Sequence, residues 1–432
     1  MSGRAAAAAR GLSGRVRRVR DRVDGFGHRV LAWAAQPASR PWWAAMFAVV
    51  VGISVATSLR ENWGSDNAFA VKAADALLAG ESPYEDKRFL YLPSAVLLAV
   101  PEALVPTPVL RVLLPALVSG LVAVGWWASL RLLSVPARSR FAVVGFGVLA
   151  IGFKPYVNLV LIGNWTVLSA AALPVALCWA AGGRWGRAGM LLGLAVAAKP
   201  MLVPMAAVFL LARAWRGLAG LVLVPLGLSL AGALAMPSPS LFFTKTLPFL
   251  LGGQDAFALP WDASPIAVLP RLGVPAWVAV GVSFAGAAAG LWAVWARWRR
   301  GDEGPLRLAE TSCAVMLAAF LVSRPSFDHY LLVVLPLLLV STARVGAVAR
   351  SVWLWVALVP QVGGVPWPGL SGKRRAFRDC FTLVVIAGTV VRGCLRPARV
   401  NLDDERTAGA VVPSARSHPG ERPARAGARP AF

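Results

Sequence analysis

The chain has 432 residues, of which 57% are hydrophobic and 15% are charged, and this excludes an ordinary soluble domain because most side chains must face lipid. Its formal charge of +24 comes mainly from arginines in short segments between apolar runs and in two polar tails, the positive-inside pattern of membrane proteins. We therefore expect anionic membrane lipids and lipid phosphates as partners, and no nucleic acid.

The first 40 residues predict a basic cytoplasmic tail. An alanine run is followed at once by arginines, so the apolar core of a cleaved signal peptide is missing. Residues 41–59 are the first predicted span and carry the chain outward. Residues 60–88 are then external and hold six carboxylates, among them Asp66.

Later basic clusters mark predicted returns to the cytoplasm. They are Arg131/Arg138/Arg140, Arg184/Arg187, Arg213/Arg216, Arg297/Arg299/Arg300, Arg344/Arg350 and the tail from Arg396. The intervening outer turns fall near residues 163–164, 199–200, 237–264, 324–330 and 371–379. This threading predicts an all-α polytopic membrane protein of about 12 transmembrane helices over residues 41–396. Residues 397–432 form a second cytoplasmic tail that we expect to be disordered.

Two apolar stretches are poor spans. Residues 89–106 contain several prolines. If they crossed the membrane, the later basic clusters would no longer fall on the cytoplasmic side, so we interpret these residues as a re-entrant or interfacial hairpin on the outer face. The halves 189–198 and 201–211 are short and meet at Lys199. Interrupted helices are tolerated where they line a cavity, so we expect a cavity near this lysine.

Asp66 and Lys199 are the leading candidates for chemistry. Asp66 can be the N-cap of a helix over residues 66–78, or a carboxylate base at the membrane surface. A lysine between two apolar halves costs about 2.5–3.5 kcal/mol on insertion scales, so Lys199 needs an anionic partner or water, unless it snorkels to the surface.

Three other outer segments carry polar groups. Residues 236–270 combine Lys245 and Asp262 with five aromatic residues, which suits either a sugar-facing surface or an interfacial belt. Arg324, Asp328, His329 and Tyr330 cluster at a further turn. Residues 371–379 hold four cations, which indicates an anionic ligand outside or an error in the threading there. The four cysteines are widely spaced, so we expect neither disulfides nor a metal site.

Several strings together resemble the membrane GT-C glycosyltransferases that take sugars from polyprenyl phosphates in actinobacterial envelope synthesis. The strings are Asp66, Gly80–Tyr84 (GESPY), Phe89–Pro93 (FLYLP), Gly163–Trp165 (GNW), Ala198–Pro200 (AKP) and Asp328–Tyr330 (DHY). The resemblance extends over most of residues 41–396. Within that family, residues 240–252, with the core FFTKTLP, look most like the branching arabinofuranosyltransferases.

The resemblance implies roles for single residues. Asp66 matches the family's acidic residue in the first outer loop, where the catalytic base resides. Lys199 matches a lysine before proline and is the first candidate for the donor phosphate, Asn164 stands where Gln or Asn is frequent, and the pair His329 and Tyr330 matches a His-Tyr or Tyr-Tyr pair. The remaining substrate-binding candidates are Arg88, Tyr91, Lys245, Asp262 and Arg324. Asp262-Ala263-Ser264 and Leu92 depart from the family pattern.

The resemblance also implies the reaction. We expect arabinofuranose transfer from decaprenyl-phosphoryl arabinose to a cell-wall arabinan, forming an α-1,3 branch on the outer face of the plasma membrane by inverting single displacement, with no metal and no cofactor besides the lipid-linked donor. A mannosyltransferase using polyprenyl-phosphate mannose for phosphatidylinositol mannosides or lipoglycans is the first alternative. A transporter or lipid flippase is the second.

Overall fold

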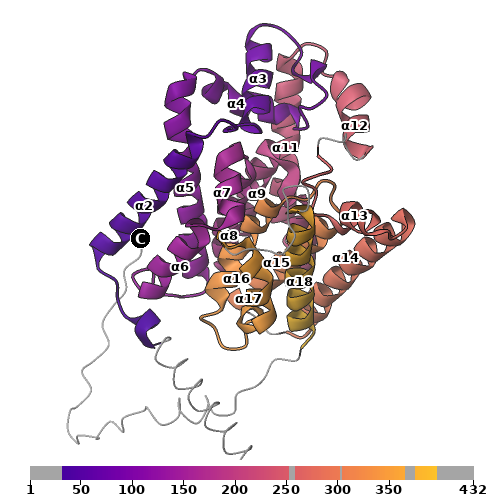
Figure 1. Ribbon diagram of the computed structural model, residues 1–432. Coiled ribbons are helices and arrows are strands. Elements are labelled where there is room, and N and C mark those ends of the chain that lie inside the picture. The colour runs from indigo at the N-terminus through magenta and orange to yellow at the C-terminus, as the bar shows by residue number, and fades with distance from the viewer. Residues whose placement is uncertain (1–31, 253–257, 302–303, 365–374, 397–432) are drawn as a thin grey trace, which may run out of the picture. The chain divides into compact units, whose positions relative to one another are not determined.

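The computed structural model describes residues 32–252, 258–301, 304–364 and 375–396. Within these ranges the named elements are all helical, and β-structure is limited to two isolated bridges (Figure 1). The prediction of an all-α chain is therefore confirmed for this part of the protein.

Among the described residues, five helices are long and apolar enough to cross a bilayer. They are α2 (Arg40–Ser58), α5 (Thr107–Leu132), α11 (Trp215–Ala235), α14 (Ala276–Arg299) and α15 (Pro305–Val322). Shorter apolar helices include α4 (Pro93–Ala103), α6 (Arg140–Ala150), α8 (Thr166–Ala181) and α9 (Trp185–Ala198). These helices make the chain a membrane protein, while the count of about 12 spans stays a prediction.

The remaining elements are short, except for the last helix. They are α3 (Asn67–Leu78), η1 (Pro83–Glu85), α7 (Lys154–Ile162), η2 (Pro200–Met205), α10 (Ala206–Leu211), the π-helical η3 (Phe242–Thr246), α12 (Leu247–Leu251), α13 (Pro265–Val268), η4 (Pro270–Leu272), η5 (Asp328–Val333), α16 (Leu335–Ser341), η6 (Val348–Arg350), α17 (Val352–Leu358), η7 (Val359–Gln361) and the longer α18 (Arg375–Leu395). Several follow or contain proline, which ends helices early because it lacks the backbone N–H.

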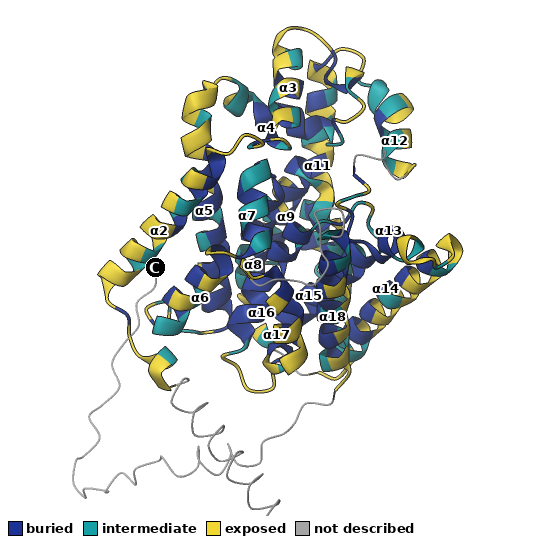
Figure 2. Cartoon of the chain, viewed as in Figure 1, coloured by how far each residue is buried: buried dark blue, intermediate teal, exposed yellow. Residues whose placement is uncertain are grey.

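Burial separates helices that face lipid from those that face protein. Only 17% of the apolar window of α11 is buried, against 72% of that of α15. The exposed side of α11 is a leucine stripe at helical spacing, Leu223, Leu226, Leu230 and Leu234. Figure 2 shows the same exposure along α2 and α14. Exposed leucines of this kind are stable where the surrounding solvent is hydrocarbon.

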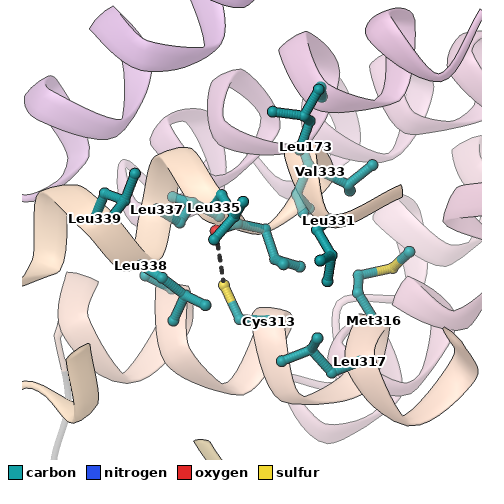
Figure 3. Close-up of a cluster of buried hydrophobic side chains, with 14 of the residues drawn as sticks. Leu173, Cys313, Met316, Leu317, Leu331, Val333, Leu335, Leu337, Leu338 and Leu339 are labelled. Atoms are coloured by element: carbon teal, nitrogen blue, oxygen red, sulfur yellow. Dashed lines mark hydrogen bonds between the residues drawn. The ribbon is translucent and has the colours of Figure 1, made fainter. Parts of the chain in front are cut away.

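The interior is an aliphatic core centred on α15, η5 and α16. Leu331, Leu335 and Leu338 from the chain after the 324–330 turn are buried against Met316 and Leu317 of α15 (Figure 3). The Sγ of Cys313 lies 3.7 Å from the carbonyl oxygen of Val334. This packing fixes the position of the turn that carries His329.

Some of the predicted turns lie beside one another, while the side of the membrane that each turn faces stays a prediction. At the basic end, the amide of Ala38 donates to the carbonyl of Arg138 at 2.6 Å. The Arg300 guanidinium likewise donates to the carbonyl of Cys394 at 2.7 Å. At the other end, the amide of Asp66 donates to the carbonyl of Ile162 at 3.0 Å. The first outer loop therefore lies beside the turn at residues 163–164.

Helix α4 is too short to cross a bilayer. Its 11 residues rise about 16 Å, roughly half of the hydrocarbon thickness. The Ser94 hydroxyl donates to the carbonyl of Ala197 at 2.6 Å, so the first turn of α4 is attached to the end of α9. This contact places α4 against α9, which ends directly before Lys199, while the re-entrant or interfacial hairpin stays a prediction.

Helices α9 and α11 touch through glycines. A Cβ on Gly189 would lie 1.9 Å from the carbonyl oxygen of Gly217, and one on Gly193 would lie 2.4 Å from that of Gly220. Small residues at such positions let helix backbones approach closely in a membrane. The contact holds α9, and with it Lys199, against α11.

We expect Gly189→Ala to lower the stability of the folded protein by about 1–3 kcal/mol, because the new methyl group meets backbone that must shift. Thermal unfolding of the protein in detergent measures the effect. Gly227→Ala is the matched control on α11, since a Cβ there meets nothing within 4 Å. An equal decrease in stability in both variants would show that the loss does not come from the close contact between α9 and α11.

Candidate active site

Asp66 stands at the N-cap position of α3 without capping it. Its side chain makes no cap hydrogen bond. Instead, the Asp66 carboxylate accepts a hydrogen bond from the Nδ2 of Asn164. The capping interpretation of Asp66 is therefore wrong, and its half-exposed carboxylate is directed toward the turn between α7 and α8.

Asn164 is held in one orientation. It follows Gly163, whose φ of 65° gives the left-handed end of α7, and its side chain is buried. The Asn164 Oδ1 accepts hydrogen bonds from the Lys199 Nζ at 2.7 Å, the Thr166 amide at 2.8 Å and the Thr166 hydroxyl at 2.7 Å. With the oxygen used in this way, the amide nitrogen is free to donate to Asp66.

Lys199 occupies the break between α9 and η2. Its extended backbone, with φ −152° and ψ 121°, is what the following proline imposes, so α9 ends at Ala198. The ammonium donates to Asn164 and, at 3.0 Å, to the hydroxyl of Thr166. It also lies 4.9 Å from the ring centre of Tyr330 and 6.0 Å from that of Tyr91, within the range of cation–π attraction.

One amide therefore joins a carboxylate to an ammonium. Asp66 and Lys199 do not form a direct ion pair in the described part of the chain, because Asn164 bonds to each from opposite ends. Each charged group keeps other directions open for a ligand. Such a pair can accept a proton at Asp66 and offer hydrogen bonds to an anion at Lys199.

A row of aromatic rings leads away from this cluster. Trp165 lies 6.0 Å from Tyr91 between ring centres, and Tyr91 lies 5.6 Å from Phe89. Phe89 continues to Tyr84 at 5.5 Å, and Tyr84 to Phe242 at 5.4 Å. Phe242 begins the FFTKTLP string, so the row connects that segment to the Asp66–Asn164–Lys199 cluster.

His329 lies beside the same cluster. Its ring stacks on Phe327 at 5.5 Å and meets the ring of Tyr330 edge-on at 5.0 Å. Its Nδ1 is 3.5 Å from an oxygen of Asp328, while the buried Nε2 has no hydrogen-bond partner among the described residues. Burial lowers the pKa of His329, and Asp328 only partly offsets this, so the imidazole is neutral near pH 7. A proton on Nδ1 then leaves Nε2 as an acceptor.

Asp328 belongs to a buried ionic network behind His329. Its carboxylate accepts hydrogen bonds from Asn158 on α7 and, at 2.7 Å, from the Arg375 guanidinium on α18. Burial alone raises the pKa of Asp328, but the charges and hydrogen bonds of Arg375 and His329 together outweigh burial and hold this pKa below its usual range. Arg375 also lies 3.4 Å from Asp379. The network joins α7, η5 and α18.

The structure assigns other contacts to the remaining candidates. One oxygen of Asp262 accepts from the amides of Ser264 at 2.8 Å and Ser326 at 2.9 Å, and its other oxygen lies 4.0 Å from the Nε of Arg324. This carboxylate therefore ties the outer loop to the 324–330 turn. Lys245 pairs with Glu85 at 2.8 Å on the surface, and Arg88 is exposed on the loop before α4.

The predicted outer basic patch is only partly described. Lys373 and Arg374 lie outside the described residues. Arg375 and Arg378 are described, and both form ion pairs with buried carboxylates, Asp328 and Asp379. These two arginines therefore contribute to the packing of α18 rather than to an unpaired patch.

Sequence reasoning missed several partners of the site. Thr166 and Asn158 were not among the candidates, although Thr166 follows Asn164 by only two residues, and Arg375 was expected only as part of the outer basic patch. Their contacts with Lys199 and Asp328 span 33 to 170 residues of sequence, so local spacing does not reveal them. Within the described ranges, no group of three or more His, Cys, Asp and Glu residues is placed to hold a metal ion.

The fold and this cluster define a helical membrane protein with a carboxylate, an amide and an ammonium at the meeting point of interrupted helices. The chain belongs to glycosyltransferase family 87, whose profile matches residues 89–323. This match confirms the predicted resemblance to membrane glycosyltransferases. It covers Asn164 and Lys199, while Asp66 and His329 lie outside the matched residues.

Two curated relatives are α-(1→3)-arabinofuranosyltransferases of Mycobacterium tuberculosis, from strains CDC 1551/Oshkosh and ATCC 25618/H37Rv. Each is 28% identical to the chain over 263 residues. The alignment covers 59% of this chain and 59% of the relative, so the chain spans well under two thirds of the relatives' length. No solved structure gives a significant match.

We expect Asp328→Asn to destabilise the protein by about 3–5 kcal/mol, because it breaks a buried ion pair and leaves the part-buried Arg375 guanidinium with Asp379, at 3.4 Å, as its remaining counter-charge. Denaturation in detergent measures this cost. Combining it with Arg375→Gln should cost less than the sum of the single variants, by about 0.5–3 kcal/mol. The control is Asp86→Asn, which breaks an exposed pair with Lys72 and should cost at most about 1 kcal/mol. Additive losses at Asp328 and Arg375 would contradict the coupling.

Proposed function

We propose that the protein transfers arabinofuranose from decaprenyl-phosphoryl arabinose to a cell-wall arabinan, forming an α-1,3 branch on the outer face of the plasma membrane. The observation that carries the proposal is the bridge from Asp66 through Asn164 to Lys199. Membership of glycosyltransferase family 87 and the likeness to α-(1→3)-arabinofuranosyltransferases support the sugar and the linkage.

Two sites of charge are needed for this transfer. The anomeric carbon of the donor is bonded to a phosphate oxygen, and this bond breaks as the acceptor hydroxyl oxygen attacks from the opposite side. The electron pair leaves with the decaprenyl phosphate, and the hydroxyl proton goes to a base. A cation that binds the leaving phosphate and a carboxylate that takes the proton therefore lower the barrier together.

Asp66 and Lys199 fit these two roles. The half-exposed carboxylate of Asp66 receives the proton of the acceptor hydroxyl, and the Asn164 amide keeps it oriented. The Lys199 ammonium, already directed by Asn164 and Thr166, binds a phosphate oxygen of the donor. Because the two groups are joined through one side chain, the acceptor hydroxyl and the donor phosphate would be bound close to the same sugar.

Neighbouring groups complete the proposed site. The unpartnered Nε2 of His329 is an acceptor for a sugar hydroxyl, and the ring of Tyr330 covers the ammonium. In the row from Trp165 to Phe242, Trp165, Phe89 and Tyr84 are buried, while the partly exposed rings of Tyr91 and Phe242 offer faces on which the C–H faces of an acceptor glycan can stack. Lys245, partly exposed and three residues after Phe242, is a cation that an incoming acceptor or lipid can meet beside this row.

The donor is identified by supplying membranes that contain the protein with radiolabelled decaprenyl-phosphoryl arabinose or polyprenyl-phosphate mannose, each with an arabinan or a phosphatidylinositol-mannoside acceptor. We expect label to reach arabinan from the arabinose donor only, in α-1,3 linkage. Transfer of mannose to the lipid acceptor instead would assign the protein to the mannosyltransferases. Membranes without the protein are the blank.

We expect Asp66→Asn to reduce turnover by about 10²–10⁴-fold, since Asn cannot take the acceptor proton. Initial rates of transfer at saturating donor measure this loss. Asp75→Asn is the matched control, because Asp75 is an exposed carboxylate on α3 and should be replaced without loss. A near-normal rate in the Asp66 variant, with normal amounts in the membrane, would remove the base from the mechanism.

A further inference from the structure

Two helical hairpin turns at the basic end of the bundle have the same form. In the first, which joins α8 to α9, the amide of Arg184 donates to the carbonyl of Trp179 at 2.8 Å. In the second, which joins α10 to α11, the amide of Ala214 donates to the carbonyl of Phe209, also at 2.8 Å. Each turn is followed by a tryptophan that begins the next helix, Trp185 in α9 and Trp215 in α11.

These turns enclose a groove of about 860 Å³ that is lined by arginine and tryptophan. Four arginines line it, two from each hairpin: Arg184, Arg187, Arg213 and Arg216. All four are exposed, and none of the nine lining residues is acidic. No ion pair to any of the four occurs among the described residues. The groove therefore gathers positive charge without internal compensation.

Arg213 occupies a backbone position that disfavours arginine. Its φ is 51°, in the left-handed region, whereas the first hairpin has Gly183 with φ 75° at the matching place. A residue with a Cβ is less stable than glycine in this left-handed conformation by about 1–2 kcal/mol. The chain thus keeps a cation in the groove at a position where glycine is the easier residue.

We propose that this groove binds the phosphate headgroup of an anionic glycerophospholipid. Arginine forks bind phosphate oxygens in pairs, and tryptophan rings favour the headgroup level of a bilayer. The groove meets both requirements, with four guanidinium groups beside Trp185 and the exposed Trp215. The packed first turns of α9 and α11 add the positive ends of two neighbouring helices.

This lipid site is separate from the proposed site of sugar transfer. Helix α9 runs from the groove at Trp185 to Ala198, directly before Lys199, so the two sites are about 20 Å apart along one helix. The lipid proposal needs neither Asp66 nor the donor sugar. The lipid proposal can therefore be correct even if the proposed function is wrong, and the reverse also holds.

The rival explanation is that these arginines only set the orientation of the chain in the membrane. Arginines that act in this way need no groove, and Arg344 and Arg350 provide the comparison, because both are exposed at a predicted cytoplasmic turn and line no part of the groove. Removing two charges at either place changes the net charge equally. Only removal at the groove should affect a specific lipid site.

The test measures lipid binding to the purified full chain by native mass spectrometry in neutral detergent. The probes are a phosphatidylglycerol, a phosphatidylcholine and free glycerol phosphate. We expect preferential binding of phosphatidylglycerol, about fivefold weaker for each groove arginine removed. Arg213→Gly should weaken binding by that factor while leaving the unfolding temperature unchanged or higher, since glycine relieves the backbone strain.

The double variants Arg184→Gln/Arg216→Gln and Arg344→Gln/Arg350→Gln complete the design. Strong loss of phosphatidylglycerol in the first, with binding kept in the second, supports the site. Equal loss in both, or no preference over phosphatidylcholine, overturns it, because the charge then acts without a groove. Binding of glycerol phosphate as tight as that of the lipid also overturns it, because the groove is then a site for a soluble anion.

Discussion

The structure depends on one buried amide that is bonded to a carboxylate on one side and to an ammonium on the other. Asn164 brings together three segments that are 98 and 35 residues apart, the loop before α3, the α7–α8 turn and the break after α9. A lysine in an apolar stretch is tolerated only when its charge is solvated by partners of this kind. The same partners leave both charges accessible, so the solution to a folding problem is also the arrangement that a transfer reaction needs.

Two different sets of contacts lie on either side of this centre. Behind His329, the Asn158–Asp328–Arg375 network ties α7, η5 and α18 into one unit, and breaking a buried charge pair is costly. On the other side lies the aromatic row from Trp165 to Phe242, which ends at the π-helical η3 beside exposed residues. The ionic side holds the turn that carries His329, and most of the ring-lined side is itself packing, because Trp165, Phe89 and Tyr84 are buried.

The sequence predicted the centre of the site better than its surroundings. Asp66 and Lys199 were identifiable because a carboxylate just outside a span and a lysine inside an apolar stretch are both costly without a purpose, and the family resemblance added Asn164 and His329. Lys245 and Asp262 were chosen from similar cues, but a loop residue's composition does not say which neighbour it meets, and both have protein partners. The all-helical class followed from hydropathy, whereas the number of spans did not, because Pro200 and Pro204 divide one apolar run into α9, η2 and α10, and other apolar helices such as α8 have only 16 residues.

The shortness of α9 has a consequence for how the proposed lipid-linked donor would reach Lys199. Its 14 residues rise about 21 Å, whereas the hydrocarbon layer is about 30 Å thick. If the arginines at its start lie at one headgroup plane, the lysine at its end lies several ångströms beneath the other. The bilayer must then thin beside α9 and α4, or the substrate must sink below the neighbouring headgroups. Mismatch of this size costs a fraction of a kcal/mol per ångström, so membrane thickness itself becomes a variable that tunes access to the enzyme.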